Sequence, residues 1–170
     1  MTMTEDTRPQ VWVRAAEPVD AEDIVAMIRE LAEYERESEA ATATVEQLRT
    51  ALFGEHPLVH CLIGEVNGAV AGFALWFVNF STWQGRHGMY LEDLFVRPEF
   101  RGHGLGKMLL ADLAREAVRR DFGRLEWSVL DWNELAIGFY TAIGALPLSD
   151  WTKYRLTDQA LTELSRTNLQ

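Results

Sequence analysis

A glycine-rich segment, Arg-Gly-His-Gly-Leu-Gly at positions 101–106, places three glycines and a cation before a run with helical spacing. Glycine lacks the Cβ atom that would keep a ligand away from the backbone, and the first N–H groups of a helix are free hydrogen-bond donors. The segment therefore predicts an anion cradle that fits a pyrophosphate, to which Arg101 and Lys107 add positive charge. A plain tight turn is the alternative interpretation.

Two familiar phosphate motifs do not fit this segment. The P-loop pattern requires a glycine where Arg101 stands and a serine or threonine where Met108 stands. The dinucleotide pattern requires a glycine at position 107, which is lysine. The cradle therefore belongs to neither of these nucleotide-binding classes.

Two adjacent carboxylates, Glu92 and Asp93, interrupt the mostly apolar segment HGMYLEDLFV, which reads as a strand. Unpaired carboxylates are costly in such a strand. Successive side chains point to opposite faces unless a bulge intervenes, so only one of the two is expected to face a ligand. Either could accept a proton; pairing with an arginine of a neighbouring strand is the alternative for each.

Asn133 and Tyr140 lie seven residues apart on a segment with helical character. Seven steps of 100° return to within about 20° of the same helix face, roughly 10 Å along the axis. The two side chains are therefore expected to look toward one ligand. A tyrosine that only packs in the core is the alternative.

The elements that must position these residues alternate in type. Asn67-Gly68 predicts a tight hairpin turn, because both residues accept the positive φ angles that such a turn requires. We expect an α/β (α+β) fold with a mixed central sheet of about six strands and helices on both faces, and a single domain over 11–170 after a flexible tail at 1–10. The expected strands are 11–16, 56–66, 69–80, 87–96 (central), 124–130 and 152–156, and the expected helices begin near Asp20 or Glu22, Thr44, Gly104, Asn133 and Asp158.

Composition excludes several classes of function. A net charge of −10 argues against nucleic acid as a partner, and no apolar run is long enough for a transmembrane helix. The polar N-terminus is not a secretory signal. Cys61 is the single cysteine and stands in an apolar stretch, so we expect a buried structural thiol. The four histidines lack metal-site spacing. We therefore expect a cytoplasmic protein without metal and without membrane contact.

The charge is unevenly distributed. Residues 17–55 hold eleven acids and three bases, a net charge of −8. A solvated, solubilising surface is one interpretation, and a surface that attracts cations is the other.

Several short blocks in one order resemble the GNAT superfamily of acetyl-CoA-dependent N-acetyltransferases. The glycine segment matches the family pattern Arg/Gln-x-x-Gly-x-Gly at 101–106, although Lys107 stands where a small residue is usual. The resemblance extends to the spermidine/spermine (diamine) N-acetyltransferase branch and covers nearly the whole chain. The blocks that carry it are ELAEYE, FGEHPLVHCLIGEV, AGFALWF, YLEDLFV, RGHGLG and WNELAIGFY.

The resemblance implies a GNAT-like fold and roles for specific residues. An alkyl amine with a pKa of about 10.4 is neutral in only about one molecule in 2,500 at pH 7, so acetyl transfer needs a base. The resemblance assigns this task to Glu92, directly or through water, and assigns protonation of the leaving sulfur to Tyr140. It implies cofactor contacts by Asn133, by the strand residues Leu94, Phe95 and Val96, and by the loop residues Arg101, Gly102, His103, Gly104, Leu105, Gly106 and Lys107.

The resemblance also implies the substrate and the assembly. We expect acetyl-CoA to donate an acetyl group to a primary amine of a small cation, either a polyamine or diamine or a lysine-like amino acid such as thialysine, by direct attack in a ternary complex. The substrate-lining residues would be Tyr34, Glu35, Glu92, Asp93 and Glu126. A homodimer is implied. The rival hypotheses are a non-catalytic acetyl-CoA sensor and a protein N-acetyltransferase.

Overall fold

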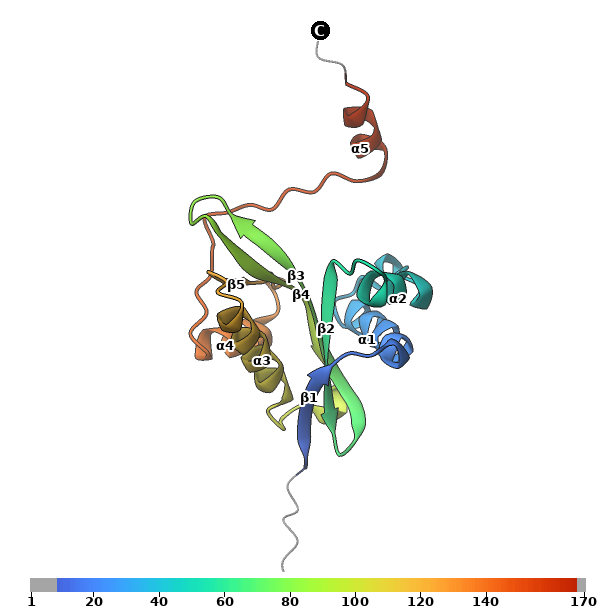
Figure 1. Cartoon of the computed structure of the whole chain (residues 1–170), viewed down its shortest axis with the longest axis vertical. Helices are drawn as coiled ribbons and strands as arrows, with labels where there is room; N and C mark the ends of the chain where they lie inside the picture. The colour runs from blue at the N-terminus through green and yellow to red at the C-terminus, as the bar shows by residue number, and fades with distance from the viewer. Residues whose placement is uncertain (1–8, 168–170) are drawn as a thin grey trace, which may run out of the picture. The chain divides into compact units, whose positions relative to one another are not determined.

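The computed structural model describes residues 9–167, and its centre is a mixed sheet with strand order β1-β2-β3-β4-β5 (Figure 1). Neighbouring strands are antiparallel from β1 to β4, whereas β4 and β5 are parallel. The mostly apolar β4 is flanked on both sides, as expected for a central strand. The strands are β1 (Val11–Ala15), β2 (Val59–Val66), β3 (Ala69–Ser81), β4 (Arg86–Val96) and β5 (Leu125–Glu126).

Helices cover both faces of the sheet. α1 (Ala21–Tyr34) and α2 (Val45–Phe53) lie on one face, and α3 (Leu105–Arg119) lies on the other (Figure 1). The core beneath α1 and α2 is a cluster of buried side chains: Ile24, Val25, Met27, Leu48, Leu52, Cys61, Ile63, Phe73, Leu75 and Phe95. Burial of this apolar surface holds both helices against the sheet.

Local sequence signals are confirmed at the hairpin and at one helix start. Asn67 and Gly68 have φ angles of 51° and 80° and connect β2 to β3. Thr44 caps α2 in a capping box with Gln47, whose backbone N–H donates to the threonine hydroxyl at 3.2 Å. Both signals act within a few residues, so the rest of the fold does not override them.

Two predicted strands differ from the structure. The segment 124–130 contributes only Leu125 and Glu126 to the sheet. The segment 152–156 forms no strand, so the sheet of the described residues has five strands instead of about six. A strand requires a hydrogen-bonded neighbour, and the described part of the C-terminal unit, which contains 152–156, has only the helices α4 (Glu134–Ala142) and α5 (Asp158–Ser165).

The chain divides into two compact units, Met1–Ser128 (unit 1) and Val129–Gln170 (unit 2). Unit 1 holds the whole sheet with α1, α2 and α3, and unit 2 holds α4 and α5. The single domain over 11–170 stays a prediction, and most of the tail predicted at 1–10 lies outside the described residues. Within 9–167, no helix combines the length and the apolar character needed to cross a membrane.

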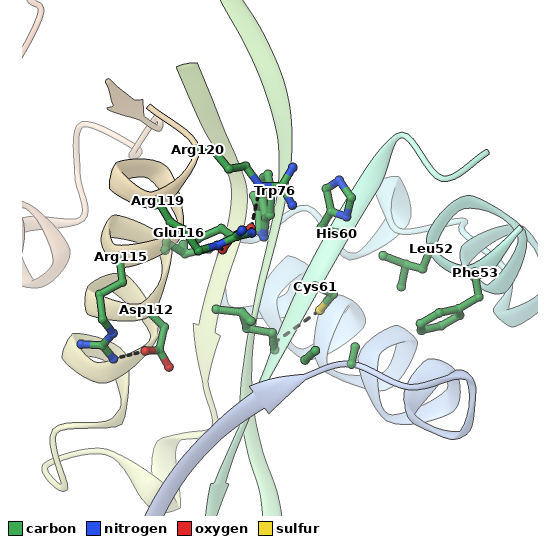
Figure 2. A pocket seen from close by; sticks show the side chains of 14 residues that line it. Leu52, Phe53, His60, Cys61, Trp76, Asp112, Arg115, Glu116, Arg119 and Arg120 are labelled. Carbon is green, nitrogen blue, oxygen red and sulfur yellow. Dashed lines mark hydrogen bonds and ion pairs between the residues drawn. The ribbon is translucent and has the colours of Figure 1, made fainter. Parts of the chain in front are cut away.

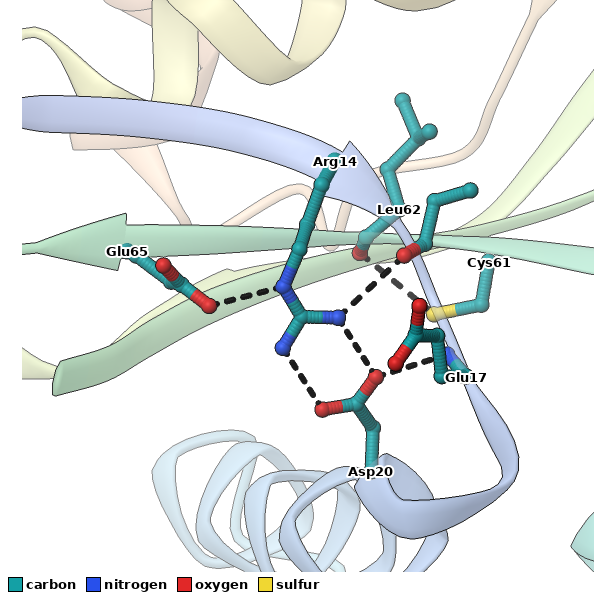
Figure 3. A network of polar contacts seen from close by, with 7 residues as sticks. Arg14, Glu17, Asp20, Cys61, Leu62 and Glu65 are labelled. Atoms are coloured by element: carbon teal, nitrogen blue, oxygen red, sulfur yellow. Dashed lines mark hydrogen bonds and ion pairs between the residues drawn. The ribbon is translucent and has the colours of Figure 1, made fainter. Parts of the chain in front are cut away.

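A partly buried ion-pair network connects β1 to the start of α1. The Arg14 guanidinium donates to both carboxylate oxygens of Asp20 at 2.7 and 2.8 Å and to Glu65 of β2 at 2.7 Å (Figure 3). Asp20 is only 3% exposed and also accepts the backbone N–H of Glu17 at 2.7 Å. The network satisfies a carboxylate that would otherwise be costly to bury.

Candidate active site

A β-bulge in β4 lies at the two predicted carboxylates. Asp93 pairs with Leu75 of β3 and Leu91 pairs with Trp76, so Glu92 is an additional residue without a partner opposite it. Glu92 is exposed, whereas Asp93 is partly buried. The rule that successive side chains point to opposite faces of the sheet therefore does not apply to Glu92 and Asp93, as expected where a bulge intervenes.

Beyond the bulge, one edge of β4 is open within unit 1. The backbone N–H of Arg97 donates to Ala71 of β3 at 2.9 Å. Backbone groups alternate along a strand, so those of Leu94 and Val96 point away from β3. On that side β5 pairs with only two residues, both before the bulge. The Phe95 side chain is buried in the core, and its backbone is paired with Phe73 of β3, so cofactor contact by Phe95 stays a prediction.

The charges of Glu35 and Glu92 both act on Asp93, and these three carboxylates are called the carboxylate cluster here. Burial raises the pKa of Asp93 to about 6, and the charges of Glu92 and Glu35 contribute to this rise. Burial also raises the pKa of Glu35, which follows the last residue of α1. The end of α1 and the bulge of β4 thus form one acidic site, which favours a cationic ligand.

The glycine loop, residues 101–107, leads from β4 into α3. Gly102 and Gly104 have φ angles of 84° and 81°, in the left-handed region that favours glycine. Gly104 is the N-cap of α3 and has no side chain that could cap the helix. It therefore leaves the first N–H groups of α3 available to a ligand. His103 and Lys107 are exposed. This backbone suits a diphosphate.

The Arg101 side chain turns back from the glycine loop toward α1 and β4. Its Nε donates to the Val96 carbonyl at 2.9 Å, and the guanidinium carbon lies 5.2 Å from the Tyr34 ring centroid and 5.8 Å from that of Phe95. Sequence reasoning missed this contact, because nothing local connects the end of α1 with a loop far along the chain.

Glu126, a predicted substrate-lining residue, is engaged by its neighbours in unit 1. Asn79 Nδ2 donates to Glu126 Oε2 at 3.1 Å, and Arg124 Nε lies 2.9 Å from the same oxygen. These partners come from β3 and from the residue before β5. Contact of Glu126 with a substrate stays a prediction.

In unit 2, Asn133 and Tyr140 both belong to the segment that forms α4. Asn133 is the N-cap and its Oδ1 accepts the backbone N–H of Ala136 at 3.2 Å, which confirms the predicted helix start. Tyr140 is partly buried, and its ring centroid lies 5.5 Å from that of Phe139. Their roles toward cofactor and sulfur stay predictions.

A pocket of about 530 Å³ in unit 1 is formed by residues of β1, α2, β2, β3 and α3 (Figure 2). None of the predicted site residues lines it. Its rim carries ion pairs within α3 and the residue after it, between Asp112 and Arg115 and between Glu116 and two arginines, Arg119 and Arg120. Each of these three guanidinium groups is paired with one of the two carboxylates. The pocket contains none of residues 101–107, so it is not the expected anion site.

Two further predictions concern metal and thiol chemistry. Among the described residues, no group of three or more histidine, cysteine or acidic side chains could hold a metal ion. Cys61 is 7% exposed, and burial raises its pKa to about 12. The expectation of a buried structural thiol is confirmed.

Comparisons with known proteins identify the family. Residues 22–145 match the acetyltransferase (GNAT) family. The chain is 39% identical over 166 residues to a thialysine N-epsilon-acetyltransferase of Bos taurus, covering 91% of this chain and 97% of the relative. It is 32% identical over 163 residues to a human spermidine/spermine N(1)-acetyltransferase-like protein 1, covering 90% of this chain and 23% of that protein.

A solved structure has a similar fold. An integron cassette protein from the mobile metagenome of V. cholerae has a TM-score of 0.77 and 29% identity, covering 92% of this chain and 98% of its own. The fold, the family match and the full-length relatives agree: the chain belongs to the GNAT family and is an acetyltransferase.

Proposed function

We propose that this enzyme transfers an acetyl group from acetyl-CoA to a primary amine of a small cationic substrate, by direct attack in a ternary complex. The substrate is a polyamine or diamine, or a lysine-like amino acid such as thialysine. The observation that carries the proposal is the carboxylate cluster at the bulge of β4, immediately before the open strand edge and the glycine loop.

The cofactor-binding residues fit coenzyme A by chemistry. The left-handed glycines and the start of α3 offer backbone donors for a diphosphate, and Lys107 adds a cation. The open edge offers the backbone groups of Leu94 and the N–H of Val96 for an extended amide-containing arm, while the Val96 carbonyl accepts from Arg101. When bound, acetyl-CoA supplies an activated acyl group as a thioester.

The protein's own residues handle protons and orientation. Glu92 is exposed beside the partly buried Asp93, and it takes the proton of the amine directly or through water. Asp93 and Glu35 hold the cationic substrate by charge. Tyr140 supplies the proton that the departing thiolate needs, because a phenol with a pKa of about 10 can donate to a sulfur whose conjugate acid has a pKa near 8.5.

The choice of amine is supported by charge and by the relatives. Three carboxylates in one site suit a substrate with more than one ammonium group. A thialysine acetyltransferase and a spermidine/spermine acetyltransferase-like protein both align with about nine tenths of this chain. The test therefore includes both polyamines or diamines and lysine-like amino acids.

The test is acetyl-CoA turnover with spermidine, putrescine, thialysine and lysine. We expect saturable acetylation of at least one amine, and a loss of roughly 100-fold or more in Glu92→Gln, which removes a proton acceptor. Release of coenzyme A only at the rate of spontaneous hydrolysis, with all four amines, would contradict the proposal.

We also propose a homodimer located in the cytoplasm. Unit 2 carries exposed large apolar side chains, among them Leu146, Leu148 and Tyr154, and such surfaces commonly mark interfaces. Light scattering on the eluted protein should give twice the mass of one 19.3 kDa chain. A mass of one chain at micromolar concentration would contradict the dimer.

A further inference from the structure

The Arg101 side chain joins two parts of the site that are distant in sequence. Arg101 is the first residue of the glycine loop. Its guanidinium carbon lies 5.2 Å from the ring centroid of Tyr34, the last residue of α1. The Val96 carbonyl occupies its Nε at 2.9 Å, and the centroid of the buried Phe95 ring lies at 5.8 Å. All three contacts direct the cation toward α1 and β4.

The end of α1 also reaches the carboxylate cluster. Glu35 follows Tyr34 directly, and its charge acts on Asp93. The helix stops sharply there, because Glu35 N–H closes the last turn on Leu31 at 2.9 Å and Arg36 adopts a positive φ of 64°. One helical turn thus contacts the glycine loop through Tyr34 and is followed directly by Glu35, a member of the carboxylate cluster.

The side chain of Arg101 is poorly placed to act as a phosphate ligand while it keeps these contacts. The backbone donors of the glycine loop and of the α3 start do not depend on it, and Lys107 is an exposed cation on the first turn of α3. A guanidinium stacked on an aromatic ring fixes the orientation of both groups. The contact therefore orders the end of α1.

We propose that Arg101 is a positioning residue that connects the coenzyme loop with the amine-binding end of α1, while Lys107 and the backbone donors hold the diphosphate. This inference rests on the proposed function. Binding of the coenzyme orders the glycine loop, and the contact of Arg101 with Tyr34 then restricts the end of α1. Glu35 is thereby held where its charge acts on Asp93. Because coupling between two sites is reciprocal, amine binding strengthens coenzyme binding by the same factor.

The test is hydrogen exchange of the backbone amides at 30–37, with and without coenzyme A as the probe. In the unmodified protein, coenzyme A should slow exchange there about fivefold, a factor typical of modest coupling. In Arg101→Gln, coenzyme A should still bind with a Kd changed less than about threefold, but the slowing should be lost. Tyr34→Leu, which removes the ring, should lose it equally.

Lys107→Gln is the matched control, because it removes a neighbouring cation of the same loop. It should weaken coenzyme A binding about tenfold and keep the slowing at saturating coenzyme A. With amine as the varied substrate, Arg101→Gln should raise KM several-fold more than it lowers kcat, and Arg101→Lys should restore part of the loss.

Two results would overturn this inference: persistent slowing in Arg101→Gln, or a loss of coenzyme A affinity in Arg101→Gln as large as in Lys107→Gln. The proposed function fails separately. If the unmodified protein binds coenzyme A but acetylates no amine, the amine assignment is wrong, and the exchange data still decide the role of Arg101.

Discussion

Two aspartates show how one side-chain type acquires opposite properties. Asp20 is buried against the Arg14 guanidinium, whose hydrogen bonds lower the pKa of Asp20. Asp93 is partly buried among other acids, and burial and repulsion raise its pKa to about 6. Ionised Asp20 therefore stabilises the fold, whereas ionised Asp93 destabilises it. In the proposed function, Asp93 is retained because it binds the cationic substrate.

Asp93→Asn should stabilise the unliganded protein at high pH. The folded pKa of about 6 lies above the ordinary value of 3.8, so the cost of the charged form is fully present above pH 6 and disappears as the pH falls toward 4. The shift corresponds to at most about 3 kcal/mol. We expect a gain of about 1–3 kcal/mol at pH 8 and less than about 1 kcal/mol at pH 4, measured by urea unfolding.

The exposed neighbour supplies the control for that measurement. Glu92→Gln removes an acid from the same bulge but from an exposed position, so its effect on the free energy of unfolding should be within about 0.5 kcal/mol. A lower stability of Asp93→Asn at pH 8 would mean that an ionised Asp93 is well paired.

Asp20→Asn should have the opposite effect. The pKa of Asp20 is lowered in the fold, so its stabilising contribution is present above the unfolded value and is lost as the pH falls through the lower folded value. We expect a loss of about 2–4 kcal/mol at pH 7, because Arg14 keeps only Glu65 as a carboxylate partner. Thermal unfolding from pH 7 to pH 2 should show the two proteins converging in acid; parallel curves would exclude this account.

Tyr140→Phe tests the proposed acid. Removal of one hydroxyl group should lower kcat by roughly 100-fold or more if the phenol protonates the leaving thiolate, with the Kd of acetyl-CoA changed less than about threefold. Phe139→Leu, one residue away on α4, is the matched control and should keep most of kcat. Equal kcat values for Tyr140→Phe and the unmodified enzyme would show that Tyr140 does not protonate the leaving thiolate.

At the scale of elements, the sequence predicted what local chemistry decides. The Asn67-Gly68 turn and the Thr44 and Asn133 caps depend on a few adjacent residues, and each was correctly placed. The short β5 and the absence of a strand at 152–156 depend on which neighbours are available for pairing, and local propensity does not contain that information.

The candidate site follows the same division. The bulge at Glu92 was recognised only as a possible exception, because a single additional residue leaves no pattern in the alternation of apolar and polar side chains. The Arg101–Tyr34 contact is tertiary and had no sequence signal. The residue types of the site were therefore predictable, while their mutual arrangement was not.

Gly104→Ala tests whether the conformation of the glycine loop matters for coenzyme A binding separately from its effect on the stability of the fold. Gly104 has a φ of 81°, and a Cβ atom added there would meet no described atom within 4 Å beyond its chain neighbours and its own helix, so the cost is backbone strain of about 1–2 kcal/mol. Gly85 in the β3–β4 turn has a φ of 63° and an equally open surrounding, which makes Gly85→Ala the control.

We expect both alanine variants to lose similar stability in urea unfolding. Only Gly104→Ala should weaken coenzyme A binding, by about tenfold. A change of φ at this position turns its N–H away from the diphosphate to which the first N–H groups of α3 also point. Equal coenzyme A affinities for the two variants would separate the glycine loop from diphosphate binding.

At the scale of the whole molecule, negative charge dominates. The chain carries a net charge of −10, and residues 17–55, which include α1 and α2, carry −8. Such a field attracts cations and repels anions such as acetyl-CoA. The proposed function therefore requires the local donors of the glycine loop to offset this repulsion.

The salt dependence of the two substrates should consequently differ. Between about 0.01 M and 0.15 M salt, kcat/KM for a polyamine should fall several-fold, because the screening length shortens from about 30 Å to about 8 Å. With the amine saturating, kcat/KM for acetyl-CoA should fall less or rise. A steeper loss for acetyl-CoA than for the amine would contradict steering by the acidic surface.

The burial of Cys61 has a practical consequence for experiments on this enzyme. Cys61 is 7% exposed and burial raises its pKa to about 12, so very little thiolate is present at pH 7 and maleimide reagents should leave the natural chain unlabelled. A cysteine introduced at the exposed position 103 would then carry a single fluorophore without background, and its emission would report occupancy of the glycine loop in real time.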